Sequence, residues 1–201
     1  LYAYRHAFAR FTTVTYSNEA HDLATELVHL TNVAIQKHSD GYSHSHGGKW
    51  SLKNLKLYVD GTRGTEAASK LMADIGWSIV HSLKACQNVL INDRHCYECY
   101  GYDIIIDQQL KPWLVEVNAS PSLSTTTTSD RVMKMALIRD VLEVVVPKDL
   151  ANYRGAFTMG QMVPVGGFDV LYDEAYEIER EKAREAKQAK PGPGRKRETV
   201  K

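Results

Sequence analysis

Three oxygen-bearing side chains near the middle of the chain, Asp103, Glu116 and Asn118, could bind a divalent cation. Aromatic and β-branched runs flank a polar break at 107–111, a pattern that predicts a strand, a turn and a second strand. Folding about a turn near 109–110 places Asp103 opposite Glu116. Asn118 then points the same way, because side chains on a strand alternate between faces. Two opposed acids repel, and a bound Mg²⁺ or Mn²⁺, which prefers oxygen ligands, would remove that penalty.

The strands that carry these side chains are apolar on their other face. That face is expected to hold Ile104, Ile106, Val115 and Val117. A tight polar turn at 119–122 follows Asn118 and should fix the backbone beside the ligands. The alternative interpretation, two solvent-facing acids on an edge hairpin, stays open on spacing alone.

Two helices are predicted on either side of this hairpin. The first runs from Glu66 to about Ile91, with Gly61 and Gly64 in the turn before it. Its expected buried face is Leu71, Met72, Ile75, Ile79, Leu83, Val89 and Leu90.

The second predicted helix runs from Arg131 to Val145, with Ser129 or Asp130 as its N-cap and Pro147 as its stop. Its expected apolar face is Val132, Met135, Ala136, Leu142 and Val145.

Composition excludes several classes of protein. A hydrophobic fraction of 43% suits a globular protein, and no stretch of about 18 apolar residues predicts a membrane span. Three cysteines make a disulfide framework unexpected, and no nucleic-acid motif is present. A zinc site at Cys96 and Cys99 is disfavoured, because a strand would point the two thiols to opposite sides.

Charge divides the chain. Residues 179–201 carry nine Lys/Arg and four Asp/Glu, a charge of +5, so the total of +1 leaves −4 on residues 1–178. Residues 177–190 predict a solvated helix, and the following Pro-Gly repeat predicts a disordered end. The tail at 179–201 is either simply solvated or a basic arm for an acidic partner.

Three motifs, in this order along the chain, resemble the tubulin tyrosine ligase-like family. They are His29-Leu-Thr-Asn-Val-Ala-Ile-Gln-Lys37, His46-Gly-Gly-Lys-Trp-Ser51, and the hairpin from Tyr100-Gly-Tyr-Asp-Ile to Val-Glu-Val-Asn-Ala-Ser-Pro-Ser-Leu123. The residues of these motifs are most similar to those of the catalytic subunit of a tubulin polyglutamylase complex. The resemblance implies an α+β, ATP-grasp fold, an antiparallel sheet with flanking helices, of which residues 1–146 would be the carboxy-terminal part. Residues 147–178 would be an extension that packs on the domain, with a short strand or turn near Val165–Asp173.

The resemblance also implies residue roles. Asp103, Glu116 and Asn118 would be the Mg²⁺ ligands, with Glu116 bridging two ions. Thr31 and Asn32 would contact ATP. Arg10 would contact the protein acceptor or its phosphorylated carboxylate, and Lys49 and Lys134 would hold free L-glutamate. Lys134, near a helix start, would also gain from the helix dipole.

The implied activity is ATP- and Mg²⁺-dependent addition of glutamate to glutamate side chains of tubulin tails through an acyl-phosphate. Glycine or tyrosine ligation stays open, as does a non-catalytic, microtubule-binding subunit. Implied partners are tubulin, free glutamate and further polyglutamylase subunits, in cytoplasm, cytoskeleton, cilium or flagellum. Because Leu1 reads like an entry in mid-protein, we expect a fragment whose ATP-holding lobe precedes it and which does not turn over alone.

Overall fold

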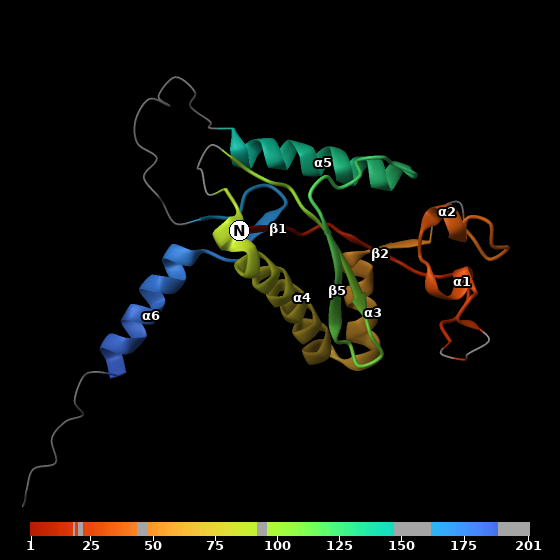
Figure 1. Cartoon of the computed structure of the whole chain (residues 1–201), viewed down its shortest axis with the longest axis horizontal. Helices are drawn as coiled ribbons and strands as arrows, with labels where there is room; N and C mark the ends of the chain where they lie inside the picture. The colour runs from red at the N-terminus through yellow and green to blue at the C-terminus, as the bar shows by residue number, and fades with distance from the viewer. Residues whose placement is uncertain (18, 20–21, 44–47, 92–95, 147–161, 189–201) are drawn as a thin grey trace, which may run out of the picture.

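The computed structural model describes residues 1–201 except 18, 20–21, 44–47, 92–95, 147–161 and 189–201 (Figure 1). The described residues form helices and short antiparallel strand pairs, which confirms the α+β class. The elements are β1 (Tyr2–Tyr4), β2 (Phe8–Arg10), α1 (Glu26–His29), α2 (Val33–Gln36), β3 (Lys49–Ser51), α3 (Leu52–Arg63), α4 (Thr65–Cys86), β4 (Gly101–Ile106), β5 (Pro112–Asn118), α5 (Thr128–Val145), β6 (Phe168–Val170) and α6 (Glu174–Gln188).

The strands form separate pairs, β1 with β6, β2 with β3, and β4 with β5. The expectation of one antiparallel sheet is therefore wrong for the residues that the structure describes. Each strand is three to seven residues long, and each sheet has only two strands. Such pairs are marginal alone, so helix packing has to hold them in place.

A small core forms where α3, α4 and the β4–β5 hairpin meet. Val59, Ala68 and Leu71 are buried there, and Ile106 packs against them from β4. The predicted first helix corresponds to α4, but α4 ends at Cys86, and a 3₁₀ turn at Gln87–Val89 follows.

Two details of the predicted first helix are wrong. Gly61 lies inside α3, and only Gly64, with a φ of 91°, makes the break between α3 and α4. Val89 and Leu90 are exposed because the chain turns off the α4 axis before reaching them.

The hairpin turn is built by Asp107. Its Oδ1 accepts from the backbone N–H groups of Gln109 and Lys111, each at 2.9 Å, and its Oδ2 accepts from Trp113 Nε1 at 2.9 Å. Leu110 adopts the left-handed φ of 62° that closes the turn. The turn thus sits where the sequence predicts it, and it sets the register of both strands.

Helix α5 begins three residues before the predicted start. Thr127 is its N-cap, with its hydroxyl accepting from the Asp130 backbone N–H at 3.1 Å, so neither Ser129 nor Asp130 has that role. Lys134 consequently lies in the second turn, and the helix-dipole argument for it does not hold.

The predicted apolar face of α5 is also wrong. Val132 and Met135 are 65% and 66% exposed, whereas Asp130, Asp140 and Val141 are buried. The helix is seated by polar contacts at two of its buried positions rather than by an apolar stripe. Figure 1 shows α5 lying across one end of the molecule, over the segment that leads from β5.

The segment after residue 161 returns to the start of the chain. β6 pairs antiparallel with β1, Tyr2 opposite Val170, and is the strand predicted within Val165–Asp173. α6 then extends away from the other elements (Figure 1), so the described part of the tail is helical as far as Gln188. No helix among the described residues is long and apolar enough to cross a membrane.

The cysteines precede the hairpin. The expectation that Cys96 and Cys99 lie on a strand is wrong, because β4 begins only at Gly101. All three cysteines are free thiols. The zinc interpretation could also have drawn on four histidines, of which His44, His46 and His95 lie outside the described residues and His38 lies within them.

Candidate metal and substrate site

The register of the β4–β5 ladder puts Asp103 directly opposite Glu116. This is the pairing predicted from the sequence, and we call these two residues the acidic pair. Like charges at opposed positions on one face destabilise an antiparallel ladder. Both side chains are exposed, so the pair is open to an ion from solvent.

Asn118 completes the cluster. Its Nδ2 donates to Asp103 Oδ2 at 3.1 Å and to Glu116 Oε1 at 3.2 Å, so one amide group faces both carboxylates. A Cβ on Gly101, the ladder partner of Asn118, would come within 2.8 Å of Pro121, which lies in the turn predicted to fix this backbone.

A register shift next to Asp103 changes the opposite face of the hairpin. Ile104 pairs with Leu114 rather than Val115, which leaves Val115 in a bulge and 57% exposed. The prediction that Val115 joins the apolar face is therefore wrong. Tyr102 does face α4, where its hydroxyl and that of Ser82 lie 2.8 Å apart.

The pKa of Asp103 is raised above its ordinary value. Burial raises the pKa of Asp103, and a hydrogen bond with Glu116 and repulsion from its charge add to the rise. The charge of Arg10 and the Asn118 amide oppose it. A proton between the two carboxylates therefore relieves the same repulsion that a cation would.

The donor chemistry fits Mg²⁺ or Mn²⁺. Among the described residues no group of three His, Cys, Asp or Glu gathers to hold a metal, and the Asn118 amide, which contacts both carboxylates, is the third side chain that could act as a ligand here. Two carboxylates and an amide suit a hard cation that also takes water and phosphate oxygens. Rotating the Asn118 amide by half a turn would present its oxygen in place of its N–H groups.

The second ladder of like charges is cationic. β2 pairs with β3 so that Arg10 is directly opposite Lys49, and we call these two residues the basic pair. The Phe8 ring lies beneath both, 5.3 Å from Arg10 Cζ and 4.6 Å from Lys49 Nζ. Cations over a ring face are stabilised by its quadrupole. The charge of Arg10 opposes the rise in the pKa of Asp103, so the basic pair lies within electrostatic reach of the acidic pair.

Lys134 reaches the same place from α5. Its Nζ lies 3.6 Å from Asp130 Oδ1, while Lys49 Nζ lies 3.1 Å from Asp130 Oδ2. The sequence placed Lys49 and Lys134 together only through the family resemblance, and the structure brings their ammonium groups to one carboxylate.

Thr31 and Asn32 stand apart from these charges. They precede α2, which lies with α1 beyond β2 and away from the hairpin (Figure 1). Asn32 is the N-cap of α2, yet its side chain makes no capping hydrogen bond, so the amide is not used by the helix. Gln36 Oε1, which accepts from the Thr13 backbone N–H at 2.8 Å, anchors this region to the chain that continues β2.

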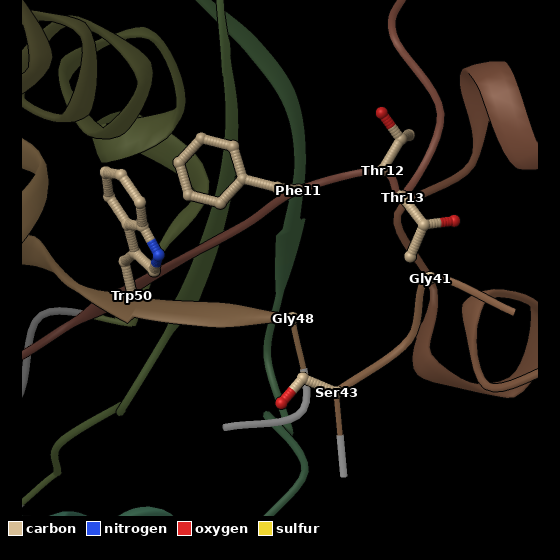
Figure 2. A pocket seen from close by; sticks show the side chains of 7 residues that line it. All are labelled: Phe11, Thr12, Thr13, Gly41, Ser43, Gly48 and Trp50. Carbon is tan, nitrogen blue, oxygen red and sulfur yellow. The ribbon is translucent and has the colours of Figure 1, made fainter. Parts of the chain in front are cut away.

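A small pocket of about 180 Å³ lies between that continuation and the segment leading to β3. Figure 2 shows Phe11 and Trp50 on one side of it, with ring centroids 4.9 Å apart, and Thr13, Gly41 and Ser43 on the other. Ser43 and Gly48 also line this pocket, and residues 44–47 between them lie outside the described part.

A comparison with known protein families gives one match over most of the chain. Residues 1–153 match the model of the tubulin-tyrosine ligase family. The chain belongs to the tubulin-tyrosine ligase family. The family expected from the three motifs is thereby confirmed.

Three relatives of the chain in this family are named as tubulin polyglutamylases. The chain is 47% identical over 180 residues to the probable alpha-tubulin polyglutamylase Ttll1 of Tetrahymena thermophila, covering 88% of the chain and 43% of the relative. It is 42% identical over 171 residues to the probable tubulin polyglutamylase TTLL9 of Bos taurus, covering 85% and 35%. It is 34% identical over 160 residues to the human tubulin polyglutamylase TTLL5, covering 72% and 12%. The chain thus spans less than half the length of each.

Sequence reasoning missed two members of the site. The sequence predicted Asp130 only as a helix cap and assigned no role to Phe8. The spacing Thr127-x-x-Asp130 resembles a capping box and could have marked Asp130 as a side chain that turns back toward the preceding loop. Nothing in the sequence predicts that this loop meets Lys49.

Proposed function

We propose that this chain carries the metal and amino-acid side of an ATP- and Mg²⁺-dependent ligase that adds glutamate to glutamate side chains of tubulin tails. The observation that carries the proposal is the proximity of an acidic pair and a basic pair, each of which needs a ligand of opposite charge. The polyglutamylase names of three relatives support tubulin as the substrate.

In the proposed reaction the acceptor carboxylate attacks the γ-phosphorus of ATP, and ADP leaves. The amine of free glutamate then attacks the resulting acyl-phosphate, loses a proton and expels inorganic phosphate as the isopeptide bond forms. Both steps place negative charge on phosphoryl oxygens, which cations must stabilise.

The residues divide this work by charge. Asp103, Glu116 and Asn118 would hold Mg²⁺, which, when bound, neutralises phosphate oxygens. Arg10, exposed and fixed over Phe8, would contact the acceptor carboxylate as it carries phosphate. Lys49 and Lys134 would bind the carboxylates of the incoming glutamate as fixed point charges.

Thr31 and Asn32 are proposed to contact ATP, with Asn32 presenting an amide that α2 does not use. One observation favours glutamate over glycine or tyrosine as the amino acid. Two lysines share one carboxylate, so the cluster has a surplus positive charge, which suits the extra side-chain carboxylate of glutamate.

The test is transfer of radiolabelled glutamate to tubulin by the full-length protein in the presence of ATP and Mg²⁺. Glu116→Gln keeps the size of the side chain but removes one ligand charge, and it should lower the rate at least about a hundredfold. Lys70→Gln, at an exposed helix position, is the matched control and should keep activity.

The alternatives predict other results. Labelled glycine or tyrosine transferred in place of glutamate would identify another ligase of the family. Binding to microtubules with no transfer of any amino acid would indicate a non-catalytic subunit. Wild-type rates in Glu116→Gln would refute the metal assignment.

The same proposal includes further polyglutamylase subunits and a location on the cytoskeleton or cilium. It also includes docking of the basic tail at 179–201 on acidic tubulin tails. The isolated 201 residues are expected not to catalyse ATP hydrolysis or glutamate ligation. Tubulin affinity that is unchanged at low salt after deletion of 179–201 would exclude the docking role.

A further inference from the structure

Asp130 is a buried carboxylate held between two ammonium groups. Its side chain is 2% exposed, and its Oδ2 accepts from Lys49 Nζ and from the Thr126 backbone N–H, each at 3.1 Å. Its Oδ1 lies 3.6 Å from Lys134 Nζ and accepts no hydrogen bond from any described residue. A buried charge with an unfilled oxygen is costly, so a role beyond stability is needed to explain it.

The two ammonium groups are fixed from three directions. Lys49 Nζ also donates to Thr126 Oγ1 at 3.1 Å and lies over the Phe8 ring. Lys134 Nζ donates to the Ser124 carbonyl oxygen. Strand β3, the loop before α5 and α5 itself therefore meet at Asp130, whose carboxylate contacts both ammonium groups.

The cluster still has capacity for a ligand. Two ammonium charges and one carboxylate charge leave a net charge of +1. The lysine side chains are 10% and 14% exposed. Each ammonium has three N–H donors, of which contacts with the described residues use two at most. Without Asp130 the two cations would lose their common partner, and each would reorient toward water.

We infer that Asp130 is a positioning residue that holds Lys49 and Lys134 at the separation needed to bind the carboxylates of a dicarboxylic amino acid. The inference rests on the proposed glutamate ligation. Asp130 itself does not contact the substrate, because its side chain is buried beneath the two lysines and only 2% exposed.

A second aspartate on α5 provides a matched control. The Asp140 side chain is 3% exposed, and its Oδ2 accepts from the Gly167 backbone N–H at 2.8 Å and from Tyr4 Oη at 3.2 Å. Its Oδ1 accepts from Arg139 Nε at 2.9 Å. Asp140 is therefore fully partnered and joins α5 to the β1–β6 pair, away from both lysines.

The experiment compares Asp130→Asn and Asp140→Asn in the full-length protein, with steady-state kinetics in glutamate and in ATP. Asp130→Asn should raise the KM for glutamate about tenfold, with the KM for ATP unchanged and kcat within about twofold. Asp140→Asn should lower the melting temperature and leave both KM values unchanged.

Several results would overturn the inference. An unchanged KM for glutamate in Asp130→Asn would make Asp130 structural only, and a lower KM would mean that it merely competes with the substrate for the lysines. Absence of glutamate transfer by the wild type would refute the proposed function itself, which is a separate outcome.

Should Asp130→Asn fail to fold, Thr126→Val replaces it. This exposed position loses the hydroxyl, which accepts from Lys49 Nζ at 3.1 Å and donates weakly to Asp130 Oδ2 at 3.5 Å, and it keeps the backbone N–H that donates to Asp130. We expect a two- to threefold higher KM for glutamate, roughly the loss of one modest hydrogen bond, and an unchanged KM would contradict the inference.

Discussion

The acidic pair and the basic pair both oppose like charges across a short antiparallel ladder, but the fold treats them differently. Asp103 and Glu116 are exposed, and a single amide spans them. Lys49, by contrast, is nearly buried against a buried carboxylate. The acidic pair is therefore open to a cation from solvent, whereas within the basic pair Lys49 already contacts a protein carboxylate and the exposed Arg10 does not.

This difference has a physical reason. A bound metal ion itself neutralises the carboxylates, so its ligands need only the correct geometry and access to solvent. Lysine side chains are long and flexible, and they lose their geometry unless something holds them. A permanent counter-ion supplies that geometry at the cost of part of the positive charge.

The largest predicted effect is the loss of stability when Lys49, the nearly buried member of the basic pair, is replaced. Lys49→Met should lower the free energy of unfolding by about 3 kcal/mol, because Asp130 loses its hydrogen-bonded cation inside the fold. Chemical denaturation of the full-length protein measures this. Arg10→Met, the other member of the basic pair, is exposed and should cost less than about 1 kcal/mol. Equal losses in the two variants would remove the distinction between them.

A smaller effect of opposite sign is predicted for the acidic pair. Asp103→Asn should raise the free energy of unfolding without Mg²⁺ by about 0.5 kcal/mol, since it removes repulsion across the ladder. It should also abolish the stabilisation that wild-type protein gains from added Mg²⁺. Destabilisation of the metal-free protein by this substitution would show that the two acids do not repel.

The smallest effect is in the titration of the two aspartates. The pKa of Asp103 is raised above 3.8, so its contribution to stability is present below pH 3.8 and is lost as pH rises through the folded-state pKa. Burial opposes ionisation of Asp130, but the Thr126 N–H and Lys49 outweigh it and hold its pKa below 3.8. Its contribution is therefore present above pH 3.8 and is lost as pH falls through the folded-state pKa.

Carboxyl carbon shifts in NMR spectra of metal-free protein would report both titrations. Asp103 should titrate above pH 3.8 and Asp130 below it. A saturating concentration of Mg²⁺ should lower the pKa of Asp103 and leave that of Asp130 in place. Titration of both groups on the same side of 3.8 would contradict the contrast.

Alternation of side chains and a recognisable turn were enough to predict the acidic pair. Asp107 and its neighbours specify the turn locally, so the pairing of Asp103 with Glu116 follows from residues close in sequence. The bulge at Val115 was not foreseeable, because one extra residue in a strand leaves no compositional signal.

The basic pair could not be predicted in the same way. Arg10 and Lys49 are far apart in sequence, and only the long-range pairing of β2 with β3 makes them neighbours. The face of α5 was predicted wrongly because hydrophobic spacing was taken as the guide. Two buried aspartates seat that helix instead, and their partners come from distant segments.

The central claim, that the acidic pair is a cation site facing a basic pair, is tested most directly by Mn²⁺ binding to the full-length protein, followed by electron paramagnetic resonance with and without ATP. We predict that wild-type protein binds Mn²⁺ more tightly when ATP is present. Glu116→Gln should weaken this binding at least about tenfold, while Asp130→Asn should leave it unchanged. Unchanged Mn²⁺ affinity in Glu116→Gln would contradict the account.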